Sequence, residues 1–359
     1  DPFVPRATTI NPDTSGTHFL ILAGVPMHDS GGGQRSAQLA LELLHRSHRV
    51  TYVYRYRSSD RIRQKLRFAH ENLTHIRFSE FSARRFGLER GPRERIVVIS
   101  EFPLPEYRAI SSYLRSRGAL TIYDCVDAWD TSLGYGWYTR RTEDALAQEV
   151  DVVIASAKAL QDDLRTRTGR DVSLLPNAVN TRIFRRGKKY ERPLQMPQAQ
   201  AIYTYVGALW GEWFNWDWIQ ALARAQPNAA VVLIGEYRGE CRNPPPNVHF
   251  LGLLKQTELP AWLAHSDVAL IPFKLDQIVR AVSPLKVFEY LSMGCPVVAS
   301  QMPELEGLPG VVTANSTEDF VRAVVDATGK RPERDEVTKF VLEHSWTARV
   351  KELERLAGC

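Results

Sequence analysis

The sequence predicts two α/β domains, each built on a parallel β-sheet that helices cover on both faces. Short apolar runs rich in β-branched residues alternate with segments of helical spacing, as in β-α-β units. This alternation stops in a polar, proline-containing stretch around residues 183–200 and then starts again. A length of 359 residues also suits two hydrophobic cores better than one. Each half is therefore expected to form a Rossmann-like domain.

The first half contains the predicted elements of an N-terminal domain at residues 17–182. Residues 1–16 are rich in Pro, Thr and Ser, so we expect a linker-like leader and a chain that is part of a longer protein. A helix is predicted at Gln34–Leu44. Strands are predicted at 18–24, 48–56, 95–100, 119–125, 150–156 and 172–177.

The second half repeats the pattern in a C-terminal domain at residues 201–344. Strands are predicted at 202–207, 229–235, 247–252, 268–273 and 296–300. Helices are predicted at 215–225, 257–265 and 284–293. A terminal helix with Trp346 and Leu353 at helical spacing is predicted at 345–359.

The composition is that of an ordinary globular protein, with 44% hydrophobic and 24% charged residues. The cysteines (Cys125, Cys241, Cys295 and Cys359) have no spacing typical of a disulfide framework or zinc site, which favours a reducing, cytoplasmic compartment. No apolar run is long enough to span a membrane, and no signal peptide is recognised.

The segment from Arg55 to Arg95 is strongly basic, with twelve Lys/Arg against five Asp/Glu and interleaved aromatic residues. One interpretation is a solvated helix face. The sharper one is contact with anionic headgroups at the inner membrane face or with a lipid-diphosphate acceptor. Nucleic acid is disfavoured, because no nucleic-acid-binding motif accompanies the segment.

Residues that follow the strands are the candidates for function, because open parallel sheets bind ligands at the carboxyl ends of their strands. The first strand leads into a loop with Gly31, Gly32 and Gly33, which is not the G-x-G-x-x-G fingerprint. It either forms a tight turn or admits a ligand closely. His28 and Asp29 on this loop are candidate acceptor contacts.

Three carboxylates, Asp124, Asp127 and Asp130, lie at the carboxyl end of the strand predicted at 119–125, after Tyr123. Any one of them suits a helix N-cap, but together they offer a general base for deprotonating a hydroxyl group. Asp127 is the first choice and Asp124 the second. The spacing is not a D-x-D metal signature, so no required metal is predicted.

In the second half, Gly207 and Gly235 end strands, and four tryptophans fall between Trp210 and Trp218. Such a tryptophan cluster is usually core or interface, although stacking on a sugar or base is an alternative.

The helix at 284–293 carries the most specific pattern. Ser283 suits the N-cap and Pro284 the first helical position, so free backbone N–H groups lie beside Lys286. A diphosphate would bind there. Glu289 is one turn further on the same face, where its carboxylate can accept hydrogen bonds from a ribose diol. The alternative, a surface Lys–Glu pair, fits poorly with so apolar a segment.

These motifs resemble those of GT-B glycosyltransferases. The stretch "SPLKVFEYLSMGCPVVAS" is similar to their donor-binding segment P-x-K-x-x-E-Y-x-x-x-G-x-P-V-V. "DVVIASAKALQDDL", "LLPNAVNTRIF" and "NVHFLGLLKQTELPAWLAHSDVALIPF" resemble further blocks of that superfamily. The resemblance is strongest to bacterial exopolysaccharide and teichuronic-acid enzymes of the family-4-like, xanthan glucuronosyltransferase-like type.

The resemblance implies transfer of a sugar from a UDP- or GDP-linked donor to a saccharide or lipid-linked saccharide, without a further cofactor. Donor contacts would be made by Gly207, Ser283, Pro284, Leu285, Lys286 and Glu289. Acceptor contacts would lie on the loop with His28, Asp29, Gly32 and Gly33. The last helix would cross back onto the N-terminal domain.

Two departures from the family pattern bear on the stereochemistry. Retaining members often carry E-x7-E, but the earlier position here is Ala281, and the histidine often found near Val126 or Asp127 is missing. Both departures favour an inverting enzyme with an N-domain carboxylate as base. A non-catalytic glycosyltransferase-like module of a larger assembly remains an alternative. A sugar-nucleotide epimerase would need cleft acids and histidines that the sequence lacks.

Overall fold

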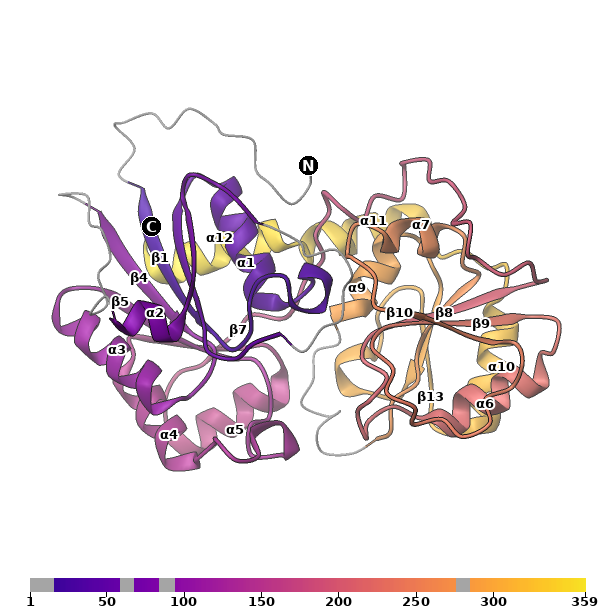
Figure 1. Ribbon diagram of the computed structural model, residues 1–359, viewed down its shortest axis with the longest axis horizontal. Coiled ribbons are helices and arrows are strands. Elements are labelled where there is room, and N and C mark those ends of the chain that lie inside the picture. Colours follow the sequence, from indigo (N-terminus) through magenta and orange to yellow (C-terminus); the bar gives the residue numbers. More distant parts are fainter. Residues whose placement is uncertain (1–15, 59–67, 84–93, 276–284) are drawn as a thin grey trace.

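The computed structural model describes residues 16–58, 68–83, 94–275 and 285–359, which form two α/β domains side by side (Figure 1). Ser283 and Pro284, the leader at 1–15 and much of the basic segment lie outside the described residues.

The N-terminal domain is built on a seven-stranded sheet in the order β3-β2-β1-β4-β5-β6-β7. All of its pairs are parallel, with Leu20 of the central strand opposite Thr51 on one side and Val98 on the other. The strands are β1 (Thr17–Ala23), β2 (Arg49–Tyr54), β3 (Leu73–Arg77), β4 (Arg95–Ser100), β5 (Leu120–Cys125), β6 (Val152–Ala155) and β7 (Ser173–Leu174).

Helices cover both faces of this sheet, because its strands are apolar on both sides. The helices are α1 (Arg35–His45), α2 (Phe78–Ala83), α3 (Pro105–Ser116), α4 (Arg140–Glu149) and α5 (Lys158–Thr168), with short 3₁₀ turns η1 (Asp29–Gly32) and η2 (Ser132–Gly134). The sequence did not predict β3, which lies within the basic segment.

The C-terminal domain has a six-stranded parallel sheet in the order β10-β9-β8-β11-β12-β13. Its strands are β8 (Ile202–Val206), β9 (Ala230–Ile234), β10 (Val248–Gly252), β11 (Val268–Ile271), β12 (Val297–Ser300) and β13 (Val311–Ala314). The helices are α6 (Trp216–Ala225), α7 (Leu259–Ala264), α9 (Leu285–Ser292), α10 (Thr317–Ala327) and α11 (Arg334–Glu343), with the 3₁₀ turn η3 (Pro303–Leu305). The predicted class of two parallel-sheet domains is confirmed.

Local signals explain where several helices begin and end. Asn215 caps α6 by accepting a hydrogen bond from the backbone N–H of Trp218, and Ser316 caps α10 in the same way through Asp319. The turn after α9 contains Gly294, whose φ of +71° favours glycine. The described part of the helix predicted at 284–293 is Leu285–Ser292.

Both sheets reverse their strand order at one point, between β1 and β4 in the first and between β8 and β11 in the second. In open α/β sheets, ligands bind in the crevice at the carboxyl ends of the strands beside such a reversal. The segments that follow β1, β4, β8 and β9 are therefore where a site is expected.

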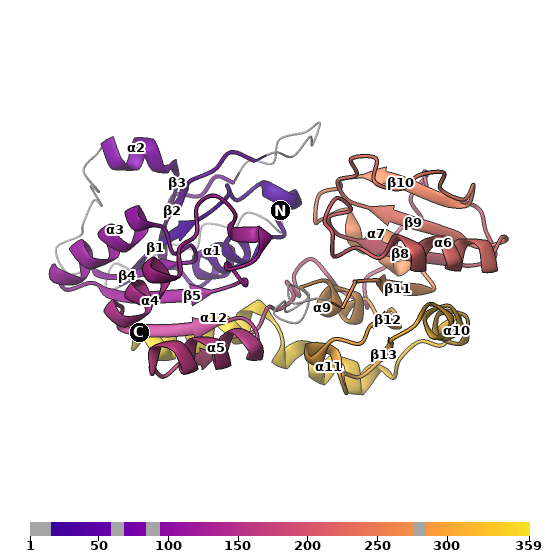
Figure 2. The ribbon, with the colours of Figure 1, turned by 90° about the horizontal axis from the view of Figure 1, so that it is seen from below.

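The last helix, α12 (Trp346–Ala357), leaves the C-terminal domain and packs along α1 of the N-terminal domain (Figures 1 and 2). Arg46 donates two hydrogen bonds of 2.7 Å to the Glu354 carboxylate, and His48 Nε2 lies 2.8 Å from it. A single hydrophobic cluster continues from α1 through α12 into α9 and α11, so the domains share buried apolar surface. Within the described residues, no helix is long and apolar enough to cross a membrane.

Candidate functional site

A cavity of about 290 Å³ lies between the two domains at the carboxyl ends of their strands. From the N-terminal domain it is lined by the loop after β1 and the start of α1, and from the C-terminal domain by the segments after β8 and β9 and the start of α9. Six of its lining residues are Asp29, Gly33, Gln34, Gly207, Leu285 and Lys286. Five of these are among the predicted site residues, and the cavity brings both predicted half-sites together.

The glycine loop after β1 packs against the other domain. Gly31 has a φ of +69°, and a Cβ there would lie 2.5 Å from the carbonyl oxygen of Leu254. The Gly31 carbonyl accepts a hydrogen bond of 3.1 Å from the backbone N–H of Gln256. Gly33, by contrast, lines the cavity, and a Cβ there would meet Ser30 O, the nearest atom, at an ordinary contact distance of 3.5 Å. At Gly31, the missing side chain therefore allows the loop to approach the C-terminal domain closely.

The carboxyl ends of β8 and β9 meet at two glycines, Gly207 and Gly235, that line the cavity. A Cβ on Gly235 would lie only 1.7 Å from the carbonyl oxygen of Gly207, so the two strand ends pack backbone against backbone. Next to them Trp210 is 38% exposed and lines the cavity. The Arg238 guanidinium covers its ring at 4.5 Å from the centroid. The space beside both glycines is thus filled by protein atoms, since a Cβ on Gly207 would lie 2.4 Å from the Tyr205 hydroxyl oxygen.

Helix α9 places Lys286 and Glu289 on one face at the cavity. Lys286 Nζ donates to Glu289 Oε2 at 3.0 Å, and the lysine side chain keeps part of its surface exposed while the glutamate is buried. The Gln256 amide donates to the other oxygen of Glu289 at 3.0 Å. The positive charge therefore faces the cavity and the carboxylate lies behind it.

The predicted acceptor contacts differ in availability. Both oxygens of Asp29 accept hydrogen bonds. Oδ2 accepts from Ser30 and Gln34 in the same segment, and Oδ1 accepts at 2.7 Å from Ser58, which follows β2. His28 lies edge-on to the ring of His75 with 6.2 Å between centroids. The arrangement shows Asp29 organising the loop as well as lining the cavity.

Asp124 is fully buried at the end of β5 and forms a two-point ion pair with Arg35 at the start of α1. Arg35 donates from Nε at 2.8 Å and from Nη2 at 3.0 Å, and its Nη1 donates to Asn177. Burial raises the pKa of Asp124, and the guanidinium opposes this rise. With both oxygens engaged, Asp124 is better placed to hold Arg35 than to remove a proton.

Asp127, three residues further on, is half-buried. Burial raises the pKa of its carboxyl group to about 7, with Arg35 opposing the rise. A carboxylate that titrates near neutral pH suits a general base. Asp130 instead pairs at the surface with Arg140.

Sequence reasoning missed Glu101, which directly follows β4. Its side chain is only 3% exposed, and its Oε1 atom has no hydrogen-bond partner. Burial and, to a smaller extent, the neighbouring Asp124 carboxylate raise the pKa of Glu101 to about 8, although the Arg35 guanidinium opposes the rise. The rule that selected the residues after β5 would have found Glu101 had it been applied to β4.

Two arginines of the basic segment make contacts outside the cavity. Arg55 pairs with Glu106 at 3.4 Å, and Arg95 donates to the carbonyl of Gly358.

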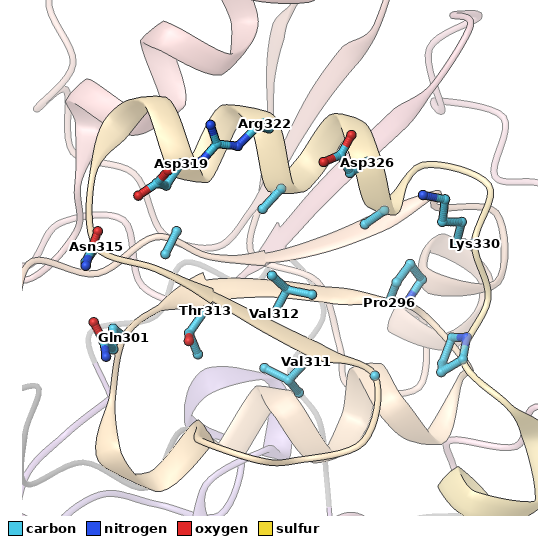
Figure 3. Close-up of a pocket in the computed structure, with 15 residues that line it drawn as sticks. Pro296, Gln301, Val311, Val312, Thr313, Asn315, Asp319, Arg322, Asp326 and Lys330 are labelled. Atoms are coloured by element: carbon cyan, nitrogen blue, oxygen red, sulfur yellow. Dashed lines mark hydrogen bonds and ion pairs between the residues drawn. The ribbon is translucent and has the colours of Figure 1, made fainter.

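A larger hollow of about 800 Å³ lies between β13 and α10, where Arg322 pairs with Asp319 (Figure 3). It contains none of the predicted site residues. The described residues include no group of His, Cys, Asp and Glu side chains able to hold a metal ion.

Comparison with known proteins places these features in context. Residues 200–329 match the family model described as Glycosyl transferases group 1. Over 201 residues the chain is 24% identical to the Bacillus subtilis (strain 168) protein TuaH, whose name assigns it to teichuronic acid biosynthesis as a glycosyltransferase. The match covers 51% of this chain and spans half of that relative's length.

Solved structures with the same fold cover nearly the whole chain. HepE of Anabaena, crystallised with UDP and glucose, superimposes with a TM-score of 0.67 at 11% identity, covering 96% of this chain and all of HepE. WaaG, described as a glycosyltransferase of lipopolysaccharide biosynthesis, gives 0.58 at 15% identity, covering 93% and 94%. The GT-B fold and the resemblance to bacterial polysaccharide glycosyltransferases are thereby confirmed.

Proposed function

We propose that this protein transfers a sugar from a nucleotide-diphosphate donor to a saccharide or lipid-linked saccharide acceptor in bacterial cell-surface polysaccharide synthesis. The observation that carries the proposal is Lys286, which lines the cavity between the two domains and pairs with the buried Glu289. The match of residues 200–329 to the glycosyltransferase family model supports it, since this region contains both residues.

The donor would bind with its diphosphate at Lys286 and the start of α9, beside the bare strand end at Gly207. The lysine stabilises the negative charge that develops on the leaving diphosphate, so the proposed reaction needs no metal ion. Glu289 would accept hydrogen bonds from the ribose hydroxyl groups. Trp210 offers a flat apolar surface beside the same cavity.

In the proposed chemistry, Asp127 removes the proton from the acceptor hydroxyl as that oxygen attacks the anomeric carbon of the donor sugar. The bond from this carbon to the diphosphate breaks, and the nucleoside diphosphate leaves with the electron pair. A base on the acceptor side corresponds to inversion, and Ala281 in place of the first glutamate of E-x7-E supports that assignment. Asp124 holds the Arg35 guanidinium in place through their ion pair. The positive charge of Arg35 lowers the pKa of Asp127 and so keeps part of it ionised at neutral pH.

The acceptor is proposed to be anionic or lipid-linked because residues 55–95 carry a net positive charge. A protein that binds such an acceptor would work at the inner face of the membrane. Sedimentation with liposomes tests this part separately. If the protein showed no preference for anionic over neutral vesicles, the proposed contact with anionic headgroups would be refuted, but the donor site would not be affected.

The central test is a thermal-shift panel of UDP, GDP, ADP, CMP and dTDP on the wild type and on Glu289→Ala. A ligand that binds only the folded state raises the melting temperature. We expect a shift with UDP or GDP that the variant loses. No shift with any nucleotide would refute the donor site. It would favour the second candidate, a non-catalytic module, which Ala281 also motivates.

A further inference from the structure

A chain of side-chain hydrogen bonds runs from the N-terminal domain to Glu289. Gln38 on α1 donates to the carbonyl of Gly32 at 2.7 Å and to Gln256 Oε1 at 2.8 Å. Gln256 then donates from Nε2 to Glu289 Oε1 at 3.0 Å. Asn180, in the segment that follows β7, donates to Gln38 Oε1 at 3.0 Å. The predicted ribose-binding carboxylate is thus two hydrogen bonds from the other domain.

This relay is buried, and its chemistry permits one orientation only. Gln38, Gln256 and Glu289 are 1%, 2% and 1% exposed. The Gly32 carbonyl can only accept, so it faces the amide nitrogen of Gln38, which also meets the oxygen of Gln256. The nitrogen of Gln256 must then face Glu289. Breaking one link leaves buried polar atoms without partners, which is unfavourable.

The backbone strengthens the same connection. The Gln256 N–H bonds to the carbonyl of Gly31, and that loop can approach only because Gly31 has no Cβ. Gln256 is therefore held to the N-terminal domain by its main chain and by its side chain. Neither Gln256 nor Glu289 lines the cavity, to which helix α9 contributes Leu285 and Lys286.

Glu289 has capacity for this relay and for a ligand together. A carboxylate accepts about four hydrogen bonds. Lys286 and Gln256 use one on each oxygen. About two positions remain, one on each oxygen, as many as a ribose diol needs. Gln256 thus supports the carboxylate rather than competing with the donor.

We propose that Gln256 is a positioning residue that couples occupancy of the donor site to closure of the two domains, an inference that rests on the proposed function. The Gln38–Gln256–Glu289 relay holds the carboxylate in place only while the domains are in contact. By linkage, a nucleotide bound at Glu289 stabilises the closed arrangement to the same extent that closure tightens its binding.

The experiment breaks the relay at two residues, one in each domain. Gln38→Ala removes the N-domain end, and Gln256→Met removes both side-chain hydrogen bonds while keeping most of the volume. Gln161→Ala is the matched control, because Gln161 is also a buried N-domain glutamine, but it bonds to the Val172 carbonyl away from the relay. Two readouts are measured: hydrogen exchange of residues 253–258 without ligand, and titration calorimetry with UDP and GDP.

Gln38→Ala is expected to speed exchange at the Gln256 amide and to weaken nucleotide binding about tenfold, within the usual range for coupled sites. The same change in a Gln256→Met background should add little, because the link is already broken. The control should resemble the wild type in both readouts.

The outcomes separate the relay from the function. Unchanged exchange in Gln38→Ala overturns the relay. Faster exchange with wild-type nucleotide affinity overturns its coupling to the donor. If the wild type binds neither nucleotide, the proposed function and the donor coupling fail together, and the exchange data alone decide whether the relay joins the domains.

Discussion

Replacing Asp127 by asparagine tests the proposed general base. The carboxyl pKa of about 7 means that roughly a tenth of the molecules carry the ionised base at pH 6 and nine tenths at pH 8. The wild-type kcat/KM should therefore rise about tenfold over this interval. A general base contributes about 10² to 10⁴ in rate, so Asp127→Asn should lose at least about 10²-fold at pH 8 and show no such rise.

The assay measures release of the nucleoside diphosphate at limiting donor and saturating acceptor from pH 5.5 to 8.5. Asp130→Asn is the matched control, because Asp130 lies three residues further on, is exposed and pairs with Arg140 at the surface. It should keep both the rate and the pH profile. Calorimetry should show that Asp127→Asn still binds nucleotide, which separates lost chemistry from lost folding.

Two results would refute this reasoning. If Asp127→Asn kept the rate and the rise with pH, the base would be another group. If the wild-type midpoint lay near 8 and vanished in Glu101→Gln, that group would be Glu101.

Three further predictions follow from the same geometry. Lys286→Ala should slow transfer by at least about 10²-fold in a steady-state assay without changing the circular dichroism spectrum, whereas normal turnover would refute its role on the diphosphate. Glu101 has a folded-state pKa of about 8 against an ordinary 4.5, so the folded chain holds a proton that the unfolded chain releases. The wild-type free energy of unfolding should thus fall as pH rises between these values, by up to about 1.4 kcal/mol per pH unit. Urea titrations of Glu101→Gln should show a flatter dependence, and an equal slope would contradict the shift. Gly31→Ala should destabilise the protein more than Gly118→Ala, because both have positive φ but only Gly31 faces a carbonyl of the other domain; equal urea midpoints would mean that the contact is unimportant.

Much of the fold could be predicted from the sequence because buried parallel strands are continuous apolar runs. The strands β2, β5, β8 and β9 fall within their predicted ranges for this reason. The edge strands β3 and β13 were missed. Each is only partly buried, with His75 in the first and the half-exposed Val312 in the second, so neither forms an unbroken apolar run.

The candidate site was predictable as a set of positions but not as a set of contacts. Residues after strands, and the Lys286–Glu289 spacing, could be found because they depend on neighbours in the chain. Arg35 lies 89 positions from Asp124, and Gln38 lies 218 positions from Gln256. No local pattern encodes such pairs. The sequence therefore could not show that Asp124, and not Asp127, forms the ion pair with Arg35.

The return of α12 to the first domain has a consequence for biosynthesis. About 170 residues separate the end of β7 from the start of α12, and the ribosome must add all of them before the N-terminal domain can acquire the helix that covers α1. Until then the apolar contact surface that receives Trp346, Val350 and Leu353 stays uncovered. Domains usually fold one after another as they emerge, and exposed apolar surface favours aggregation meanwhile. Of the two domains described, the N-terminal one is therefore completed only when residues 346–357 have left the ribosome.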